Sequence, residues 1–258
     1  DYATIQHGID AASDGDTVLV AAGTYIENII INNNIFLLGQ NPEMTIIDGN
    51  ASGDVVNKQI NGNFSMKNFT VTNGTRGFAI FLDDGTVTIE NTLIVGITEY
   101  QAIICSSDSL ILKNVTISNN PSPLGAVMDF SGGHLYITNC NFYNEPSIIV
   151  VGLESDATAT VQYSNIFGGE SSMFLFGGSS YNWGEGNIDA DPLFCSPDSG
   201  DYSLAENSPC VGTGENGVNM GAFGVGCGAI IISNIVYVAT SGSDETGNGS
   251  ETNPFATI

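Results

Sequence analysis

The amino-acid sequence predicts an all-β fold made of short, repeated strands, and three features support this prediction. β-Branched residues and turn formers are abundant, with 32 glycines among them, whereas helix-favouring runs are few. Apolar and polar residues alternate over short segments, as in a strand that buries one face. These segments recur at a nearly constant spacing, which is the signature of a repeat protein.

Length and charge exclude several classes of protein. The 258 residues suffice for one sizeable core or two small ones, and a hydrophobic content of 42% argues against disorder. Against 28 acidic residues there are only 4 lysines and arginines, so we expect no nucleic-acid partner, because binding phosphate needs clustered cations. We also expect no membrane span, since no apolar run approaches the roughly 18 residues that one requires.

The first expected element is a short helix within residues 3–12. Ile5, Ile9 and Ala12 fall on one face of such a helix. In a stack of strands this helix would cover the first coil and protect its unpaired edge.

The central part repeats one unit that contains two strands and a corner. Its copies start at Phe64, Val87, Leu110, Leu135 and, in degenerate form, Ala159. An asparagine marks the corner of the first four copies, with spacings of 23, 23 and 25 residues: Asn68, Asn91, Asn114 and Asn139. A second apolar run follows each corner. A period near 23 without a helix predicts a parallel β-helix, whose coils pair about 4.8 Å apart.

Stacked coils place equivalent residues in columns. We therefore expect the corner asparagines to form an internal ladder of amide hydrogen bonds. One column of core side chains is expected to comprise Met66, Ile89, Leu112, Ile137 and Val161.

Segments at both ends of the repeats resemble known proteins. Residues 3–25 resemble the opening of right-handed, single-stranded β-helices, and residues 189–194, 201–204 and 207–210 resemble their closing segment. The chain thus resembles the pectate-lyase-like superfamily of β-helix proteins. The resemblance implies a right-handed parallel β-helix with a short N-terminal capping helix, which we assign to residues 1–227.

Residues 228–258 are expected to form a separate C-terminal strand and loop. Residues 235–258 resemble the start of such β-helices, and Phe255–Ile258 echoes Tyr2–Ile5. We expect this segment to cap the chain's own body or to pair with the next subunit as a donated strand. The residues expected to mediate assembly are Ile231, Ile232, Ile235, Val236, Val238, Ile5 and Ile9.

The sequence offers no recognisable catalytic set. Arg76 is the only arginine and lies in a turn, and Gly133-His134 has the reverse order of the His-Gly motif of polygalacturonases. Asp83-Asp84 precedes a glycine, as in a turn. We therefore assign no catalytic or cofactor-binding residue and expect a protein without enzymatic activity.

Cysteines and acidic residues suggest two further features. Cys105 and Cys140 lie in apolar runs and are expected to be buried thiols. Cys195, Cys210 and Cys227 allow one bridge, for which Cys195–Cys210 is favoured and Cys210–Cys227 is the alternative. An oxygen-rich loop is a candidate Ca²⁺ site, with a solvated loop as the alternative; its ligands would be Asp244, Glu245, Asn248 and Glu251.

The main functional expectation is an extracellular structural protein at the cell surface. Its β-helices would stack head to tail into a filament or tandem array, so its principal partner would be itself. The alternative is a secreted, monomeric β-helix that binds or cleaves carbohydrate, with glycans as partners. In that alternative, sugars would stack on Tyr143, Tyr181 and Trp183.

Overall fold

The computed structural model describes residues 1–258 except 76, 121–125, 145–148, 231–237, 247–255 and 258. The chain divides into two units, Asp1–Gly228 and Ala229–Ile258. In the described part, no helix is long and apolar enough to cross a membrane.

The predicted N-terminal helix is present as α1 (Ile5–Ala11). Thr4 caps it, because its hydroxyl oxygen accepts a hydrogen bond from the His7 backbone N–H at 3.2 Å. Ile5 and Ile9 are buried in the main core of the same unit. The expectation that these two residues mediate assembly is therefore corrected: their side chains stabilise the chain's own first coil.

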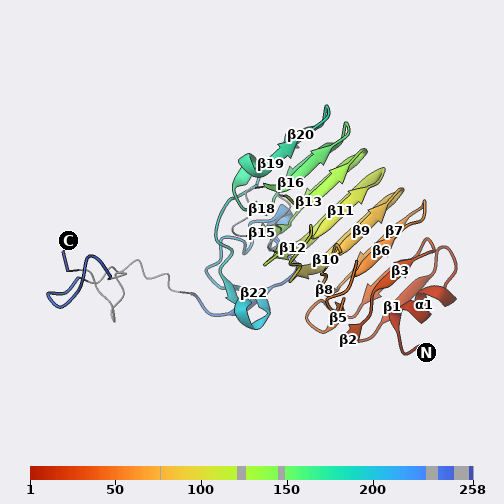
Figure 1. Ribbon diagram of the computed structural model, residues 1–258, viewed down its shortest axis with the longest axis horizontal. Helices are drawn as coiled ribbons and strands as arrows, with labels where there is room; N and C mark the ends of the chain where they lie inside the picture. Colours follow the sequence, from red (N-terminus) through yellow and green to blue (C-terminus); the bar gives the residue numbers. More distant parts are fainter. Residues whose placement is uncertain (76, 121–125, 145–148, 231–237, 247–255, 258) are drawn as a thin grey trace. The chain divides into compact units, whose positions relative to one another are not determined.

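The larger sheet of the solenoid, here called the long sheet, has 13 strands. Every pairing within it is parallel, and Figure 1 shows its strands stacked in order along the unit. Its main path is β1 (Thr17–Val20), β4 (Phe36–Gly39), β7 (Phe64–Lys67), β10 (Thr86–Val95), β12 (Ser109–Ser118), β14 (His134–Thr138), β17 (Thr158–Gln162) and β20 (Ser180–Trp183). The remaining strands are β2 (Gly23–Ile26), β5 (Thr45–Asp48), β8 (Thr70–Thr72), β15 (Asn141–Tyr143) and β18 (Asn165–Ile166).

The second sheet, here called the short sheet, has seven parallel strands. They are β3 (Ile29–Ile31), β6 (Val56–Lys58), β9 (Ile80–Asp83), β11 (Ile103–Ser106), β13 (Ala126–Ser131), β16 (Ile149–Glu154) and β19 (Met173–Leu175). These strands contain the second apolar runs of the repeats. Their inward side chains join those of the long sheet in one core.

A closing segment follows the coils and has a small core of its own. It contains the strands β21 (Phe194–Ser196), β22 (Asp201–Ala205) and β23 (Val225–Cys227) and the short 3₁₀ helices η2 (Pro197–Ser199) and η3 (Glu215–Gly217). A further 3₁₀ helix, η1 (Gly169–Ser172), precedes β19. The buried residues of the second core are Leu93, Phe194, Tyr202, Leu204, Cys210 and Met220.

The predicted core column is confirmed residue by residue. Ile89 pairs in register with Met66 on one side and with Leu112 on the other, and Leu112 leads on to Ile137 and Val161. All five side chains are buried. Together with the parallel pairing, this register confirms the predicted parallel β-helix.

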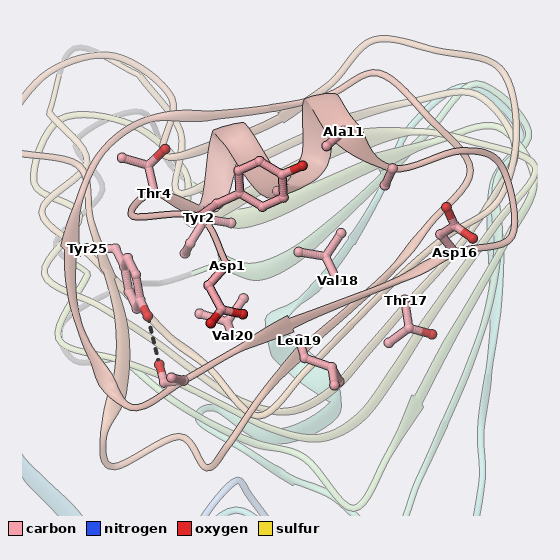
Figure 2. Close-up of a pocket in the computed structure, with 14 residues that line it drawn as sticks. Asp1, Tyr2, Thr4, Ala11, Asp16, Thr17, Val18, Leu19, Val20 and Tyr25 are labelled. Atoms are coloured by element: carbon pink, nitrogen blue, oxygen red, sulfur yellow. Dashed lines mark hydrogen bonds between the residues drawn. The ribbon is translucent and has the colours of Figure 1, made fainter.

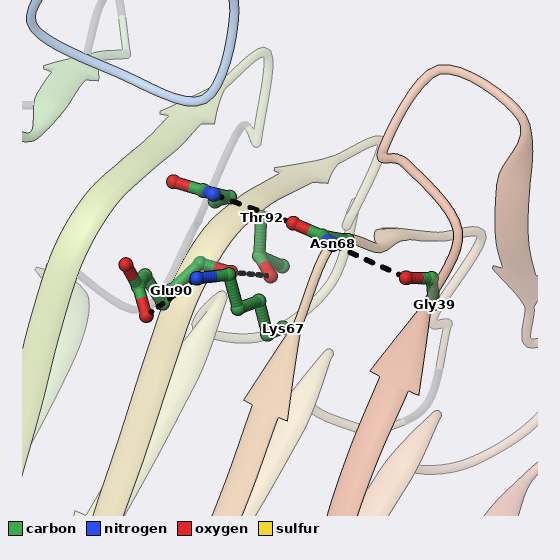
Figure 3. A network of polar contacts seen from close by, with 6 residues as sticks. Gly39, Lys67, Asn68, Glu90 and Thr92 are labelled. Carbon is green, nitrogen blue, oxygen red and sulfur yellow. Dashed lines mark hydrogen bonds and ion pairs between the residues drawn. The ribbon is translucent and has the colours of Figure 1, made fainter. Parts of the chain in front are cut away.

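The corner asparagines adopt the left-handed conformation that the turn requires. Their φ angles are 67° at Asn68, 45° at Asn91, 53° at Asn114 and 54° at Asn139. Asn91 Nδ2 donates to Asn68 Oδ1 at 3.3 Å, and Asn68 Nδ2 donates to the Gly39 carbonyl at 3.2 Å (Figure 3). One step of the predicted ladder, from Asn91 to Asn68, is confirmed, whereas Asn139 Oδ1 accepts from the Glu215 N–H at 2.7 Å instead of from another corner asparagine.

A second, more deeply buried asparagine pair lies at a different corner. Asn144 Oδ1 accepts from the Asn120 N–H at 2.6 Å, and Asn144 Nδ2 donates to the Asn120 carbonyl at 2.6 Å. Asn120 Oδ1 also accepts from the Ile97 N–H at 3.0 Å. Because these side chains replace backbone partners, they satisfy polar groups inside the solenoid.

The cysteine pairing differs from the favoured prediction. A disulfide joins Cys195 to Cys227, while Cys210 is a buried thiol in the second core. Cys195 lies on β21 and Cys227 on β23, and their Cα atoms are 5.9 Å apart, within the range that a disulfide spans. Cys105 and Cys140 are buried thiols, as predicted.

Candidate functional site

The outward face of the short sheet carries a line of equivalent residues across five coils. Register pairing aligns Phe81 with Ile104, Ile104 with Asp129, Asp129 with Gly152 and Gly152 with Phe174. We call these five residues the axial row. Strand spacing of about 4.8 Å gives the row a length of about 19 Å along the solenoid.

Asp129 is the only acidic residue of the axial row, and it lies between two inward-facing neighbours on β13. Its Oδ2 accepts a hydrogen bond from Gln101 Nε2 at 2.8 Å. Burial raises the pKa of the Asp129 carboxyl, the Gln101 hydrogen bond lowers it, and the nearby charge of Glu154 raises it. The net shift is upward, so Asp129 keeps its proton to a higher pH than an ordinary aspartic acid does.

Gln101 presents an unused acceptor beside Asp129. Its side chain is 9% exposed, and among the described residues its Oε1 has no hydrogen-bond partner. A buried carbonyl oxygen without a partner costs free energy unless a donor reaches it. This amide therefore has one group committed to Asp129 and one buried acceptor that lacks a partner among the described residues.

Glu154 lies on the next coil, two residues beyond the glycine that pairs with Asp129. Alternate residues of a strand face the same side, so both carboxylates project outward. From the spacing of strands and residues, their Cα atoms are about 8 Å apart. Two outward carboxyls on adjacent coils, one of them with a raised pKa, are a pair that could divide the roles of acid and base.

Aromatic residues flank the carboxylates on both sides. Phe81 stacks with Phe78 at a centroid distance of 6.0 Å, and Phe78 meets Tyr100 edge-on at 5.5 Å. On the other side, Phe174 and Phe176 lie 4.6 Å apart and are 43% and 51% exposed. Exposed rings beside polar groups are typical of binding surfaces for partly apolar ligands.

The aromatic residues proposed from sequence do not form such a surface. Tyr143 is partly buried against the second core and contacts Phe167 edge-on at 5.3 Å. Tyr181 and Trp183 are partly buried against the main core. All three contribute to packing.

The predicted Ca²⁺ ligands lie only partly within the described residues. The Asp244 carboxylate accepts hydrogen bonds from the backbone N–H groups of Ala256 and Thr257 and from the Thr257 hydroxyl, and these bonds lower its pKa. Glu245 is described, whereas Asn248 and Glu251 lie outside the described residues. No group of three or more His, Cys, Asp or Glu side chains suited to a metal occurs in the described part.

Four of the seven predicted assembly residues fall outside the described part of the chain. Ile231, Ile232, Ile235 and Val236 lie outside the described residues, as does Arg76. Val238 is described and is 40% exposed.

Two further clefts on the solenoid have polar groups that bond within the chain. A cleft of about 510 Å³ lies between α1 and β1 (Figure 2), where the Tyr25 hydroxyl donates to the Ala21 carbonyl and the Asp16 carboxylate accepts from the Ser13 N–H. A groove of about 560 Å³ lies beside β22, where the Thr70 hydroxyl donates to the Pro42 carbonyl. The polar groups named here are engaged within the chain, whereas the Asp129 face combines a carboxyl of raised pKa with an amide oxygen that has no partner among the described residues.

Sequence reasoning missed this site because its three polar residues come from three coils. Gln101 and Asp129 are 28 positions apart, and Glu154 is a further 25 away. The one available signal was a carboxylate within an apolar run, Val127-Met-Asp-Phe130, at an outward position of a strand.

No protein-family model and no curated protein matches the chain. Solved structures of similar fold are pectin methylesterases. The enzyme from carrot is 15% identical, with a TM-score of 0.50 over 74% of this chain and 80% of that one. The enzyme from Yersinia enterocolitica is 11% identical, with a TM-score of 0.44 over 73% and 95%. A mutant pectin methylesterase in complex with a hexasaccharide is 14% identical, with a TM-score of 0.45 over 68% and 77%.

The likeness to the carrot enzyme confirms the expected fold, a right-handed parallel β-helix. It contradicts two expectations from the sequence. The neighbours are enzymes that act on carbohydrate, so the expectations of a protein without enzymatic activity and of a structural filament subunit are wrong. The alternative of a carbohydrate-active β-helix agrees better with these findings.

Proposed function

We propose that this chain is a carbohydrate-active protein that hydrolyses a C–O bond of a polysaccharide at the Asp129 face. The observation that carries the proposal is the pairing of Asp129, whose pKa is raised, with Glu154 on a face flanked by exposed aromatic rings. The shared fold of a carrot pectin methylesterase supports a carbohydrate substrate. A disulfide and a polysaccharide substrate both fit an extracellular location.

The chemistry divides between the two carboxyls. Protonated Asp129 gives its proton to the departing oxygen as the C–O bond breaks, and ionised Glu154 takes a proton from the water that forms the new C–O bond. Glu154 then releases its proton to solvent, and solvent reprotonates Asp129. Gln101 holds the Asp129 carboxyl in place through its amide N–H.

The test is a hydrolysis screen of the full chain on polysaccharides, with one assay for new reducing ends and another for alcohols or acids released from esters. Asp129→Asn and Glu154→Gln should each lower kcat by about 100-fold or more, since general acid–base catalysis contributes about 10²–10⁴-fold. Glu206→Gln, at an exposed position in the turn after β22, is the matched control and should retain activity. Circular dichroism checks that each variant is folded.

Two results would contradict the proposal. One is full activity in both carboxylate variants, which would place the chemistry elsewhere. The other is binding of polysaccharide without release of any product, which would make the face a binding surface only.

A further inference from the structure

The ionisable groups on the described outward face of the short sheet are acidic: Asp83, Asp129 and Glu154. The described lysines lie elsewhere. Lys58 is fully buried inside the solenoid, and Lys67 and Lys113 project from the long sheet, where Lys67 pairs with Glu90 at 3.1 Å. Arg76 lies outside the described residues. The whole chain carries a net charge of −24, so a polyanion approaching this face meets like charge.

The hydrogen-bonding groups of this face also disfavour a polyanionic ligand. Ionised carboxylates such as that of Glu154 accept hydrogen bonds and donate none, and the unpartnered Gln101 Oε1 is also an acceptor. A sugar hydroxyl supplies the donor that these oxygens need, whereas the carboxylate of a uronic acid supplies only further acceptors. The 9% exposure of Gln101 means that a ligand hydroxyl would be nearly dehydrated when it reaches the amide, which makes the match in donors and acceptors decisive.

The aromatic residues set the direction of the ligand. Phe81 and Phe174 end the axial row on opposite sides of Asp129, about 19 Å apart along the solenoid. Gly152 contributes no side chain between Asp129 and Phe174. Gly152 itself is buried, so an extended sugar chain that follows the row would contact the Asp129 side chain and the two aromatic ends, with its apolar ring faces toward the rings.

We infer that the Asp129 face selects an uncharged, hydroxyl-rich glycan lying along the solenoid axis and discriminates against polyuronates. This inference rests on the proposed function and specifies its substrate class. Gln101 is a positioning and specificity-determining residue, because its amide holds Asp129 with the N–H group and meets a sugar hydroxyl with the carbonyl oxygen.

The experiment compares ligands that differ in charge but share a backbone. Affinity electrophoresis of the full chain at low salt uses polygalacturonate and its fully methyl-esterified form, with galactan and mannan as neutral polymers. We expect at least tenfold stronger retention by one or more neutral polymers than by polygalacturonate. Raising the salt concentration should narrow the difference, because screening weakens like-charge repulsion.

A pair of variants tests the role of the amide. Gln101→Met keeps the size of the side chain and removes both hydrogen-bonding groups, so retention by the neutral polymer should fall about tenfold or more. Gln162→Met, which changes an outward glutamine of β17 on the long sheet, is the matched control and should bind normally.

The outcomes separate this inference from the proposed function. Retention by polygalacturonate equal to or stronger than that by neutral polymers overturns the charge preference, and loss of that retention in Arg76→Gln would identify its cause. Hydrolysis that persists in such a case leaves the proposed function standing. The absence of both retention and hydrolysis on every polymer overturns both.

Discussion

At the scale of single residues, Asp129 shows how the position of a side chain in a coil shifts its pKa. The β13 strand holds it between two buried neighbours, Met128 and Phe130, so its carboxyl is half-buried and its pKa is raised. Gln101 opposes this effect, because its donated hydrogen bond stabilises the ionised form. The balance between burial and one hydrogen bond therefore sets the protonation state that an acid catalyst needs.

A pH profile tests this balance. If Asp129 acts as the acid, kcat/KM falls as pH rises through its pKa in the free enzyme. Gln101→Met removes the interaction that lowers this pKa, so the alkaline limb should move to higher pH. An alkaline limb that stays in place, or moves to lower pH, would contradict the assignment of Asp129 as the acid. Gln162→Met serves again as the control.

Lys58 is a second residue whose role follows from its position. It occupies an inward site in register with Ile31 and Leu82, and its ammonium donates to the carbonyl oxygens of Ile60, Asp83 and Asp84 at 2.6, 2.8 and 2.7 Å. Burial lowers its pKa. The side chain thus satisfies backbone acceptors of two successive coils from inside the solenoid.

Lys58→Met should destabilise the protein although it removes a buried charge. The substitution leaves three carbonyl groups without this donor, and an unsatisfied buried group costs about 1–3 kcal/mol. We expect the free energy of unfolding in urea to fall by about 3 kcal/mol. Leu82→Met, in the same inward column, keeps its volume and should cost less than about 1.5 kcal/mol. A Lys58→Met variant as stable as the parent would show that water satisfies these carbonyls.

At the scale of strands and turns, adjacent residues of a strand face opposite sides of the sheet, so one is buried and the next faces outward. Leu112 and Ile111 are neighbours on β12, yet Leu112 is buried in the core column and Ile111 faces outward. Leu112→Asp should abolish cooperative folding, because an unpaired buried carboxylate costs several kcal/mol. Ile111→Asp should change stability by less than about 1 kcal/mol. Urea unfolding followed by circular dichroism measures both, and equal effects would refute the register.

The closing segment gives a second prediction at this scale. The Cys195–Cys227 bridge spans 32 positions, so in the chain-entropy model its loss should lower stability by about 3–4 kcal/mol. A Cys195→Ser, Cys227→Ser double variant should reproduce the melting temperature of the reduced parent. Peptide mapping without reductant should recover the Cys195–Cys227 peptide, and recovery of a Cys195–Cys210 peptide would reject the observed pairing.

The register of the coils could be predicted because equivalent residues of successive repeats must stack on one another. Alternation and the corner asparagines defined the column from Met66 to Val161, and stacking required the same register in every coil. The disulfide was not predictable in this way. It depends on the order of β21, β22 and β23, which belong to a segment without a repeat.

The candidate site escaped prediction for a related reason. Gln101, Asp129 and Glu154 occupy non-equivalent positions on three coils, so no local motif contains them. Their proximity is a consequence of stacking, and their chemistry is a consequence of burial. Neither can be read from one segment of the sequence alone.

At the scale of the whole molecule, the net charge of −24 opposes the compact state. Folding brings the acidic side chains closer together than they are in the unfolded chain, so they repel one another more strongly in the folded state. The core and the internal asparagine pairs must therefore outweigh a repulsion that unfolding would relieve. Exposed charges of this kind are screened by salt, whereas the interior interactions are not.

This balance predicts that salt stabilises the protein. Raising NaCl from about 20 to 300 mM shortens the Debye length to below about 10 Å, so the melting temperature should rise by several degrees. KCl should act equally, since screening depends on ionic strength, and an equal osmolarity of glucose should have a smaller effect. The melting temperature is followed by circular dichroism at neutral pH. A melting temperature that falls with salt would mean that favourable surface ion pairs, such as that of Lys67 with Glu90, outweigh the repulsion among the acidic residues.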